Sequence, residues 1–392
     1  MYLKTTFFAI LLVSLLSCEN DAAKNQNLLA SNTYDTTAKS LANEPLASVK
    51  RWINSMQHNS GLMESAENTN FVSLYDNALA TIFFIQEDER AKAEDILDFY
   101  LNRMNDEVLI NGGLYQTRTT TGEEAQTLWM GDNAWLLISL NHYKKAYGSA
   151  KYDVLGARLE KWLRSLQEED GGLIGGKRAN GKEMPKITEG IITAFNAVDG
   201  YDDFHRNILK FLKHNRWDSE NSLLLAWPEN PAYAYAMDVH SLSSVIFPDM
   251  SENALYEADR FLNQQEMTTT GVLINGYGFD EDKDVVWLEG TAQMAAAFND
   301  ANRPELAKNL IEELDKSIVT ASIATNTKGL PYATNPGSSY GEGALWHHAH
   351  TKPALSASIW YVFAKTDFNP LALAKNKMIP KEDKFWVLPS IN

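Results

Sequence analysis

Residues 287–294 read Trp-Leu-Glu-Gly-Thr-Ala-Gln-Met and open a segment whose apolar residues have helical spacing. The same opening, an acid followed by a small residue or Asn, recurs along the chain at intervals of roughly fifty residues. A Gly-Leu segment, or a degenerate form of one, stands about 10 to 20 residues before each opening. The six predicted helix openings lie at Asp76, Asp132, Glu189, Asp238, Glu289 and Glu342.

A repeat of this length, made of a turn, a helix and a return helix, predicts an array of stacked helical hairpins. Strand patterns are short and rare, so we expect an all-α fold in which six hairpins close into a double ring. An acid in the first turn of a helix commonly faces its positive dipole end. In a closed ring, however, the inner N-termini all point at one cleft, where the six acids should meet. Helical apolar spacing covers residues 70–86, 89–105, 124–147, 150–167, 251–265, 287–299, 303–319 and 342–364.

The N-terminus has the pattern of a secreted lipoprotein. Lys4 precedes an apolar run, and the segment ends in Leu15-Leu16-Ser17-Cys18, which resembles the bacterial lipobox. We therefore expect residues 1–18 to be a signal peptide with Cys18 as the lipidation site. Residues 19–42 are polar and predict a flexible tether, and 43–392 form the ring domain. This organisation predicts a lipid-anchored protein of a bacterial cell envelope, in the outer membrane.

Composition and motifs exclude several classes of protein. The 35 Lys plus Arg stand against 51 Asp plus Glu, a formal charge of −16 that disfavours binding to nucleic acid. The single cysteine excludes an intramolecular disulfide and a Cys-based zinc site. The sequence has no phosphate-binding loop, no dinucleotide fingerprint and no Gly-x-Ser-x-Gly elbow.

Two stretches carry a resemblance to known proteins. Residues 278–294, which include Gly278-Phe279-Asp280, and residues 358–370 resemble toroid proteins encoded beside bacterial polysaccharide-degradation genes. The chain is similar, from residue 43 to about 370, to the (α/α)6 toroid of many glycoside hydrolases and polysaccharide lyases. Within that class it resembles the family 38 polysaccharide lyases, which act on alginate and glucuronan. The third inner helix departs from the family pattern, because Glu189-Gly190-Ile191 stands where Glu-His-Asn is expected. That departure puts identical chemistry in doubt.

The resemblance implies β-elimination on a uronate-containing polysaccharide. A base removes the proton α to the carboxylate, and an acid protonates the leaving oxygen. We assign Tyr340 and His240 to proton transfer and Glu289 to orienting or assisting them. An ionised Glu289 would repel the uronate, so it needs a cationic partner or a raised pKa. The basic residues expected near the rim are Arg118, Lys177, Arg178, Lys186 and Lys352.

Two other classes of function stay open. A glycoside hydrolase needs two carboxyl groups, about 5–5.5 Å apart for retention or 6.5–9.5 Å for inversion. Asp132, Glu189, Asp238, Glu289 and Glu342 offer such a pair, and the net acidity favours a neutral sugar. The third class is a surface lipoprotein that binds glycans without cleaving them.

Aromatic and polar residues complete the predicted site. Indole rings stack on the apolar face of sugars, which suggests Trp129, Trp287 and Trp346 as platforms. His347 and His350 share a helical face, so zinc or calcium is an alternative, but no His-Glu-x-x-His motif exists and we expect no cofactor. The predicted substrate-binding residues are Arg118, Trp129, Asp132, Glu189, Tyr277, Trp287, Trp346, His347 and Lys352.

Overall fold

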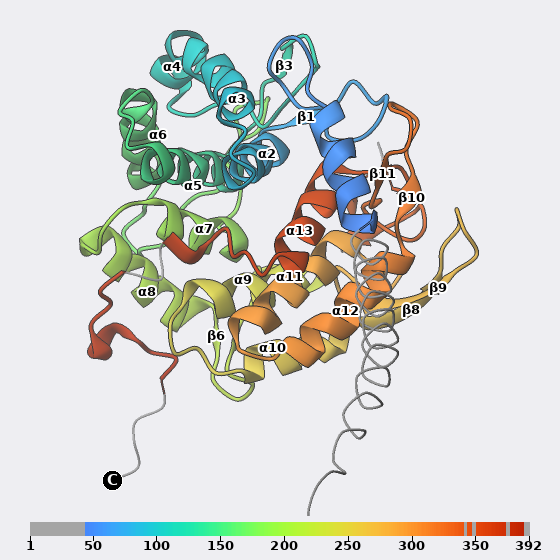
Figure 1. Ribbon diagram of the computed structural model, residues 1–392. Coiled ribbons are helices and arrows are strands. Elements are labelled where there is room, and N and C mark those ends of the chain that lie inside the picture. Colours follow the sequence, from blue (N-terminus) through green and yellow to red (C-terminus); the bar gives the residue numbers. More distant parts are fainter. Residues whose placement is uncertain (1–43, 341–342, 347–349, 374–376, 388–392) are drawn as a thin grey trace, which may run out of the picture. The chain divides into compact units, whose positions relative to one another are not determined.

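The computed structural model describes residues 44–340, 343–346, 350–373 and 377–387, and the unit Ser48–Asn392 is built from helical hairpins (Figure 1). Each inner helix packs against the next one along the chain, and the last packs against the first, so the inner ring is closed. The inner helices are α2 (Leu74–Gln86), α5 (Met130–Tyr147), α7 (Thr188–Ala197), α9 (Met237–Ile246), α11 (Leu288–Asp300) and α13 (Leu355–Lys365).

The outer helices have a different burial pattern. Inner helices are buried along most of their length, whereas an outer helix buries one stripe, such as Leu155, Leu159 and Leu163. This spacing of four residues is the pattern of a helix with one apolar face. The structure therefore confirms the predicted double ring. The outer helices are α3 (Arg90–Asn102), α6 (Asp153–Ser165), α8 (Asp203–Asn215), α10 (Asn253–Glu257) and α12 (Pro304–Lys316).

The strands are short, as predicted, and lie between the helices. β1 (Val72–Ser73), β2 (Thr117–Arg118) and β3 (Glu124–Ala125) form a three-stranded antiparallel sheet in that order. The longest pair is β8 (Leu262–Glu266) with β9 (Leu273–Tyr277), a hairpin that projects from the body (Figure 1). The other antiparallel pairs are β4 (Leu128–Trp129) with β5 (Gly176–Lys177), β6 (Trp217–Asp218) with β7 (Leu223–Leu224), β10 (Val319–Thr320) with β11 (Lys328–Gly329), and β12 (Ser339–Tyr340) with β13 (Gly343–Ala344).

A further helix covers residues 44–55. Other helices are short and irregular. They are the π-helix η1 (Met104–Val108), α4 (Leu109–Asn111), and the 3-10 turns η2 (Pro231–Tyr233), η3 (Ala258–Phe261) and η5 (Lys381–Asp383).

The residue after each acid explains why the openings recur. The Asn133 side chain accepts a hydrogen bond from the Leu114 N–H at 2.8 Å and donates to the Leu114 carbonyl at 2.9 Å. Asn77 makes the same pair of bonds with Met63. In the fifth repeat the position is Gly290, where a Cβ would collide with the Trp287 ring. The two Asn side chains thus fix the preceding segment to its helix, and Gly290 leaves room for the Trp287 ring.

Two predicted helices were wrong in their bounds. Residues 251–265 were expected to be helical throughout, but α10 ends at Glu257, η3 follows it, and the chain then enters β8. Along β8, exposed and half-buried residues alternate with the period of two that a strand requires. The related segment Gly271-Val272-Leu273 lies at the turn into β9, where Val272 and Leu273 are exposed, whereas its counterparts Leu62 and Leu114 are buried.

The sixth inner helix also begins later than predicted. It was expected near Glu342, which lies outside the described residues, but α13 starts at Leu355, directly after Pro353-Ala354. Proline fixes φ, lacks an N–H donor and disfavours helical backbone at the preceding residue, so it stops a helix from running through this point. Ser356 therefore takes the second position of the sixth helix, which Glu189, Asp238 and Glu289 take in theirs.

The Asn133 clamp leads to a test of stability. Asn133→Ala removes a buried amide and leaves the Leu114 N–H and carbonyl groups without partners, so the free energy of unfolding should fall by about 1–3 kcal/mol. The matched control is Asn180→Ala, an exposed turn residue. Urea unfolding measures both variants. A loss no larger than that of the control would contradict the clamp.

Candidate active site

The N-terminal ends of the inner helices surround a cavity of about 280 Å³. Carboxyl groups from the first five inner helices line it, and Ser356 of α13 completes the set. The repeat predicts this convergence, apart from Glu342, which is outside the described residues. The five carboxyl groups are those of Asp76, Asp132, Glu189, Asp238 and Glu289.

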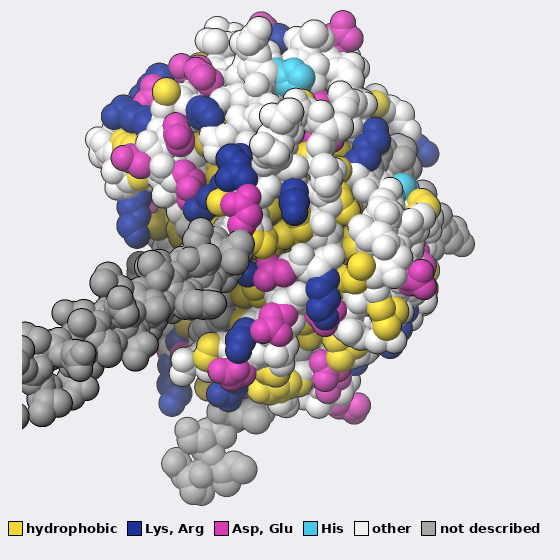
Figure 2. Space-filling model, turned by 45° about the vertical axis from the view of Figure 1, so that its right-hand side comes forward, with side chains coloured by type: hydrophobic (Ala, Val, Ile, Leu, Met, Phe, Trp, Pro, Cys, Tyr) yellow, Lys and Arg dark blue, Asp and Glu magenta, His cyan; other side chains and the backbone are white. Residues whose placement is uncertain are grey.

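Among the described residues that line this cavity there is no Lys, Arg or His. Elsewhere on the protein the charges are mixed: Figure 2 shows acidic and basic side chains interspersed over one face. The acidic lining is therefore a local property of the cavity. An ionised carboxyl group there has neither bulk water nor an opposite charge to stabilise it.

Burial accordingly raises the pKa of each of the five carboxyl groups. The pKa of Glu289 rises to about 8 and that of Glu189 to about 7, and in both cases the charge of Asp238 adds to the effect of burial. Burial raises the pKa of Asp76 and of Asp238 to about 6. The pKa of Asp132 lies well above its ordinary value, because burial is joined by the charges of Glu189 and Asp76. At neutral pH the cluster therefore holds both protonated and ionised carboxyl groups.

Glu289 is the most firmly held member of the cluster. The Tyr75 hydroxyl donates to its Oε1 at 2.7 Å, and the Ser356 hydroxyl lies 2.6 Å from its Oε2. Gln293 donates from Nε2 to the same Oε1 at 3.2 Å. Tyr75 in turn accepts a hydrogen bond from the Trp360 Nε1–H at 2.7 Å. These contacts fix the carboxyl plane, since both of its oxygens are engaged.

The other acids differ in how far the protein already engages them. Asp76 accepts a hydrogen bond from the Tyr332 hydroxyl at 3.1 Å. Glu189 accepts one from the Thr193 hydroxyl at 3.1 Å. By contrast, Asp238 Oδ1 is buried and has no hydrogen-bond partner among the described residues. Asp238 Oδ1 is therefore left to accept a hydrogen bond from a ligand.

Aromatic rings form another part of the cavity lining. Trp346 stacks on Trp287 with ring centroids 5.4 Å apart and an interplanar angle of 18°. It also lies nearly parallel to Tyr332, at 5.8 Å and 11°. Phe279 packs edge-on against Trp287. Flat apolar surfaces of this kind, beside carboxyl groups, suit the two faces of a sugar ring.

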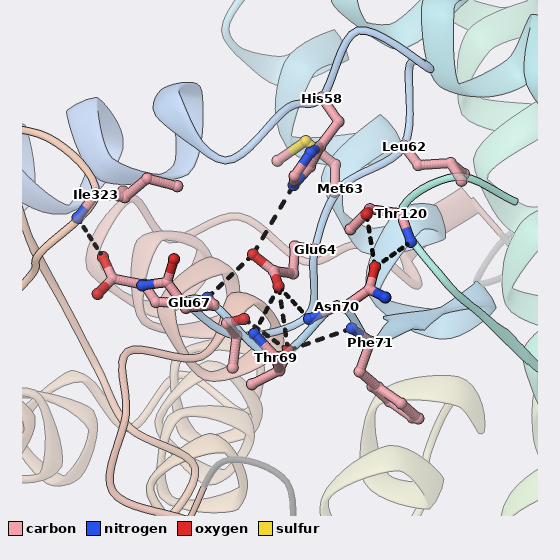
Figure 3. Close-up of polar contacts among 12 residues, drawn as sticks. His58, Leu62, Met63, Glu64, Glu67, Thr69, Asn70, Phe71, Thr120 and Ile323 are labelled. Carbon is pink, nitrogen blue, oxygen red and sulfur yellow. Dashed lines mark hydrogen bonds and ion pairs between the residues drawn. The ribbon is translucent and has the colours of Figure 1, made fainter.

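Two buried glutamates shape the loop that leads to the cavity (Figure 3). Glu64 accepts hydrogen bonds from the backbone N–H groups of the turn at 68–70. Glu67 accepts from Trp52 Nε1 at 2.8 Å and from the Ser322 hydroxyl at 2.7 Å, which joins the loop to a distant segment. The loop then delivers Phe71 to the cavity. The only sequence signal was Asn68-Thr69-Asn70, typical of a turn with positive φ.

The two predicted proton-transfer residues do not line the cavity. His240 is buried on the side of α9 that faces α10, with Nδ1 2.8 Å from the Ala254 carbonyl oxygen and its ring against Phe261. Burial lowers its pKa to about 4. Tyr340 lies at the rim, where its ring packs on Phe279, but its hydroxyl donates to the Tyr233 carbonyl at 2.8 Å. Neither side chain presents its polar group to the cavity.

Two of the basic residues expected at the rim, Arg118 and Lys352, have partners in the protein. Arg118 is buried and makes two hydrogen bonds to the Glu107 carboxylate, at 3.1 and 3.0 Å. The Nζ of Lys352 lies 3.3 Å from the Glu67 carbonyl oxygen. The long Arg118 side chain is held by this ion pair and by the rings of Phe99 and Tyr100. Sequence spacing could not reveal these partners.

The remaining predicted residues divide between the cavity and the protein interior. Asp132, Glu189, Trp287 and Trp346 line the cavity. Trp129 instead packs over Gly131, Gly175 and Gly190, and Tyr277 is buried next to the cavity lining without reaching it. His347 lies outside the described residues. The lining residues that sequence analysis did not assign to the site include Tyr75, Gln116 and Ser356.

Over the described part of the chain, no group of three or more His, Cys, Asp or Glu side chains has an arrangement suited to a metal ion. No family model matches the chain, and no curated protein matches its sequence.

Solved structures share the fold of this protein at low sequence identity. An alpha-amylase from Clostridium perfringens has a TM-score of 0.60 at 12% identity, with 83% of this chain and 98% of the amylase covered. A glycosidase in complex with glucose has a TM-score of 0.58 at 12% identity, with 83% and 95% covered. A cellobiose 2-epimerase from Bacillus thermoamylovorans has a TM-score of 0.55 at 10% identity, with 85% and 100% covered. These likenesses establish the (α/α)6 toroid.

The raised pKa of Glu289 predicts how stability changes with pH. The folded protein binds this proton more tightly than the unfolded chain, so its stabilising contribution is complete at low pH and is lost as the pH rises towards about 8. Gln does not titrate, so in Glu289→Gln this position no longer makes stability fall as the pH rises. The unfolding free energy of the variant minus that of the wild type should be more positive at pH 8 than at pH 5, by on the order of 1–3 kcal/mol. Denaturant unfolding at both pH values measures the difference. The exposed Glu305→Gln is the control, and equal behaviour of the two variants would contradict the prediction.

Proposed function

We propose that this protein is a glycoside hydrolase that cleaves an uncharged saccharide in the cavity at the inner-helix N-termini. One observation carries the proposal: five carboxyl groups line the cavity, and none of its described lining residues is basic. Glycoside hydrolysis requires two carboxyl groups and no cation. A uronate would instead bring a further negative charge next to the ionised members of this cluster.

We assign Glu289 as the general acid. Its pKa of about 8, raised by burial, keeps the carboxyl group protonated at neutral pH. Its hydrogen bonds hold it at the cavity surface in one orientation. A positioned acid of this kind is what protonation of the glycosidic oxygen requires.

We assign Asp238 as the partner carboxylate, acting on water or on the sugar itself. Its pKa of about 6 leaves Asp238 ionised at neutral pH, and Asp76 has a similar pKa and is also ionised. Asp76, however, already accepts a hydrogen bond from Tyr332, whereas Asp238 Oδ1 has no partner among the described residues. Asp238 and Glu289 line the same cavity.

The aromatic lining and the structural neighbours support an uncharged sugar. Trp287, Trp346 and Tyr332 line the cavity and supply apolar ring atoms that can contact the C–H groups of a sugar. Among the structural neighbours are an alpha-amylase and a glycosidase in complex with glucose. Carbohydrate processing is therefore the function that both the cavity and the neighbours favour.

The alternative functions differ from hydrolysis in their products. Family 38 lyase activity stays a prediction from sequence resemblance, and its proposed pair, Tyr340 and His240, is not brought together at the cavity. Epimerisation, the activity named for two neighbours, leaves glycosidic bonds intact. A glycan-binding protein would release no product.

The assay that separates these classes uses neutral glucans, glucuronan and alginate in water enriched in ¹⁸O. We expect new reducing ends on a neutral glucan, ¹⁸O in the product and no ultraviolet absorbance. Glu289→Gln and Asp238→Asn should each lower kcat by about 10²–10⁴-fold, because each loses a proton-transfer group or nucleophile. The exposed Glu305→Gln is the control and should keep full activity. Ultraviolet absorbance from glucuronan or alginate would establish a lyase instead.

We also propose that the protein is anchored to a bacterial outer membrane through a lipid on Cys18, a residue outside the described range. In the part of the chain that the structure describes, no helix is long and apolar enough to cross a bilayer. Cys18→Ser should move the protein from the membrane fraction to the soluble fraction, as measured by fractionation and immunoblotting. Retention in the membrane fraction would contradict lipid anchoring.

A further inference from the structure

The sixth inner helix breaks the repeat at the position of the acid. Five helices present Asp or Glu to the cavity, whereas α13 presents Ser356, which is fully buried. Helix α13 packs against both α11 and α2. Ser356 therefore lies between the acids of those two helices, Glu289 and Asp76.

The Ser356 hydroxyl contacts Glu289 and acts on Asp76. Its Oγ is 2.6 Å from Glu289 Oε2, and hydrogen bonding by the same hydroxyl lowers the pKa of Asp76, against the larger effect of burial. A hydroxyl has one hydrogen to donate and lone pairs to accept with. It can thus accept from a protonated carboxyl group on one side while it donates to an ionised one on the other.

The direction of the neighbouring hydrogen bonds decides which Glu289 oxygen carries the proton. Trp360 Nε1 can only donate, so the Tyr75 oxygen accepts from it and the Tyr75 hydrogen points to Glu289 Oε1. The Gln293 amide donates to the same oxygen. Oε1 therefore already receives two hydrogens, and the proton of a neutral Glu289 belongs on Oε2, next to Ser356.

We propose that Ser356 is a positioning residue for the Glu289 acid: its hydroxyl accepts the Oε2 proton and donates to the Asp76 carboxylate. This inference rests on the proposed function. When Glu289 gives its proton to the leaving glycosidic oxygen, the Ser356 hydroxyl keeps its own hydrogen and turns it from Asp76 to the new Glu289 carboxylate. At the same step the glycosidic C–O bond breaks, and the anomeric carbon bonds either to a water that Asp238 deprotonates or to the Asp238 carboxylate, which water later displaces. Glu289 regains a proton from water.

The surrounding charges are consistent with this assignment. At neutral pH Asp76, with a pKa of about 6, is ionised and can accept a hydrogen bond from Ser356. Glu289, with a pKa of about 8, is protonated and can donate one to Ser356. The titratable groups of the cavity that face Glu289 from the surrounding elements are Tyr75 and Asp76 on α2, Asp132 on α5, Glu189 on α7, Asp238 on α9, and Tyr332 in the segment before α13.

The first test is the pH profile of kcat for Ser356→Ala. Hydrogen bonds to an ionised group are stronger than those to a neutral one, so loss of the hydroxyl destabilises ionised Glu289 more than protonated Glu289. The basic limb should move to higher pH by roughly half to one unit, and kcat at the optimum should fall about 3- to 10-fold.

Ser358→Ala is the matched control, because Ser358 is equally buried in the same helix but bonds to the Leu330 backbone. It should leave the profile in place. Ser356→Cys keeps the volume with a much weaker donor and should act like Ser356→Ala. If the profiles of both Ser356 variants coincide with that of Ser358→Ala, the inference is wrong.

A second measurement does not depend on turnover. The infrared C=O band of protonated Glu289, identified as the band missing from Glu289→Gln, should titrate near pH 8 in the wild type. In Ser356→Ala its midpoint should rise and its frequency should increase, since the carboxyl group loses an acceptor. This result in a protein without hydrolase activity would reject the proposed function and keep the Ser356 assignment. An unmoved band in an active enzyme would reject the assignment alone.

Discussion

The closed inner ring brings five acids into one small space with no basic partner among the described lining residues, and the rest of the site follows from that constraint. Closure depends on α13 packing against α2, which makes all inner N-termini face the same cavity. The positive ends of those helices and a few hydroxyl donors partly offset the unfavourable burial. The offset is incomplete, because the pKa values of all five acids remain raised. Groups whose pKa values lie near neutral pH are suited to general acid–base catalysis.

Burial of these acids lowers the free energy of unfolding, and hydrogen bonds beside the cavity offset part of that loss. Asn77 and Asn133 tie the connecting segments to the inner helices through paired backbone hydrogen bonds. Glu64 and Glu67 do the same for the loop that enters the first inner helix (Figure 3). These clamps lie beside the cavity rather than in it. They hold the helix starts in place, so the acids cannot move apart to relieve their repulsion.

The fold was predictable from the sequence because it repeats. An acid, a small residue or Asn, and a Gly-Leu segment recur at similar spacing, and each part makes a local contact that the structure shows. The exceptions arise where tertiary contacts replace the local pattern. Residues 262–266 have polar, alternating character and pair with β9, and the chain before α13 is interrupted by Pro353.

The site was predictable only in part. Acids at helix starts could be expected from periodicity to share one cavity, and Glu289 and Asp132 line it. His240 and Arg118 were misplaced, because their positions depend on which side of a helix or strand faces a neighbour and on partners distant in sequence, such as Ala254 and Glu107. Ser356 could not be found by a search for acids, since it is the member of the repeat that lacks one.

The central claim is that Glu289 is the proton donor to an uncharged sugar in this cavity. A crystal structure of Glu289→Gln with a neutral oligosaccharide tests it most directly. The account predicts a sugar ring against Trp287 and the bridging glycosidic oxygen within hydrogen-bond distance, about 2.6–3.2 Å, of the residue 289 side chain. An oligosaccharide bound away from the five acids, or in the cavity with residue 289 out of reach of the glycosidic oxygen, would contradict it.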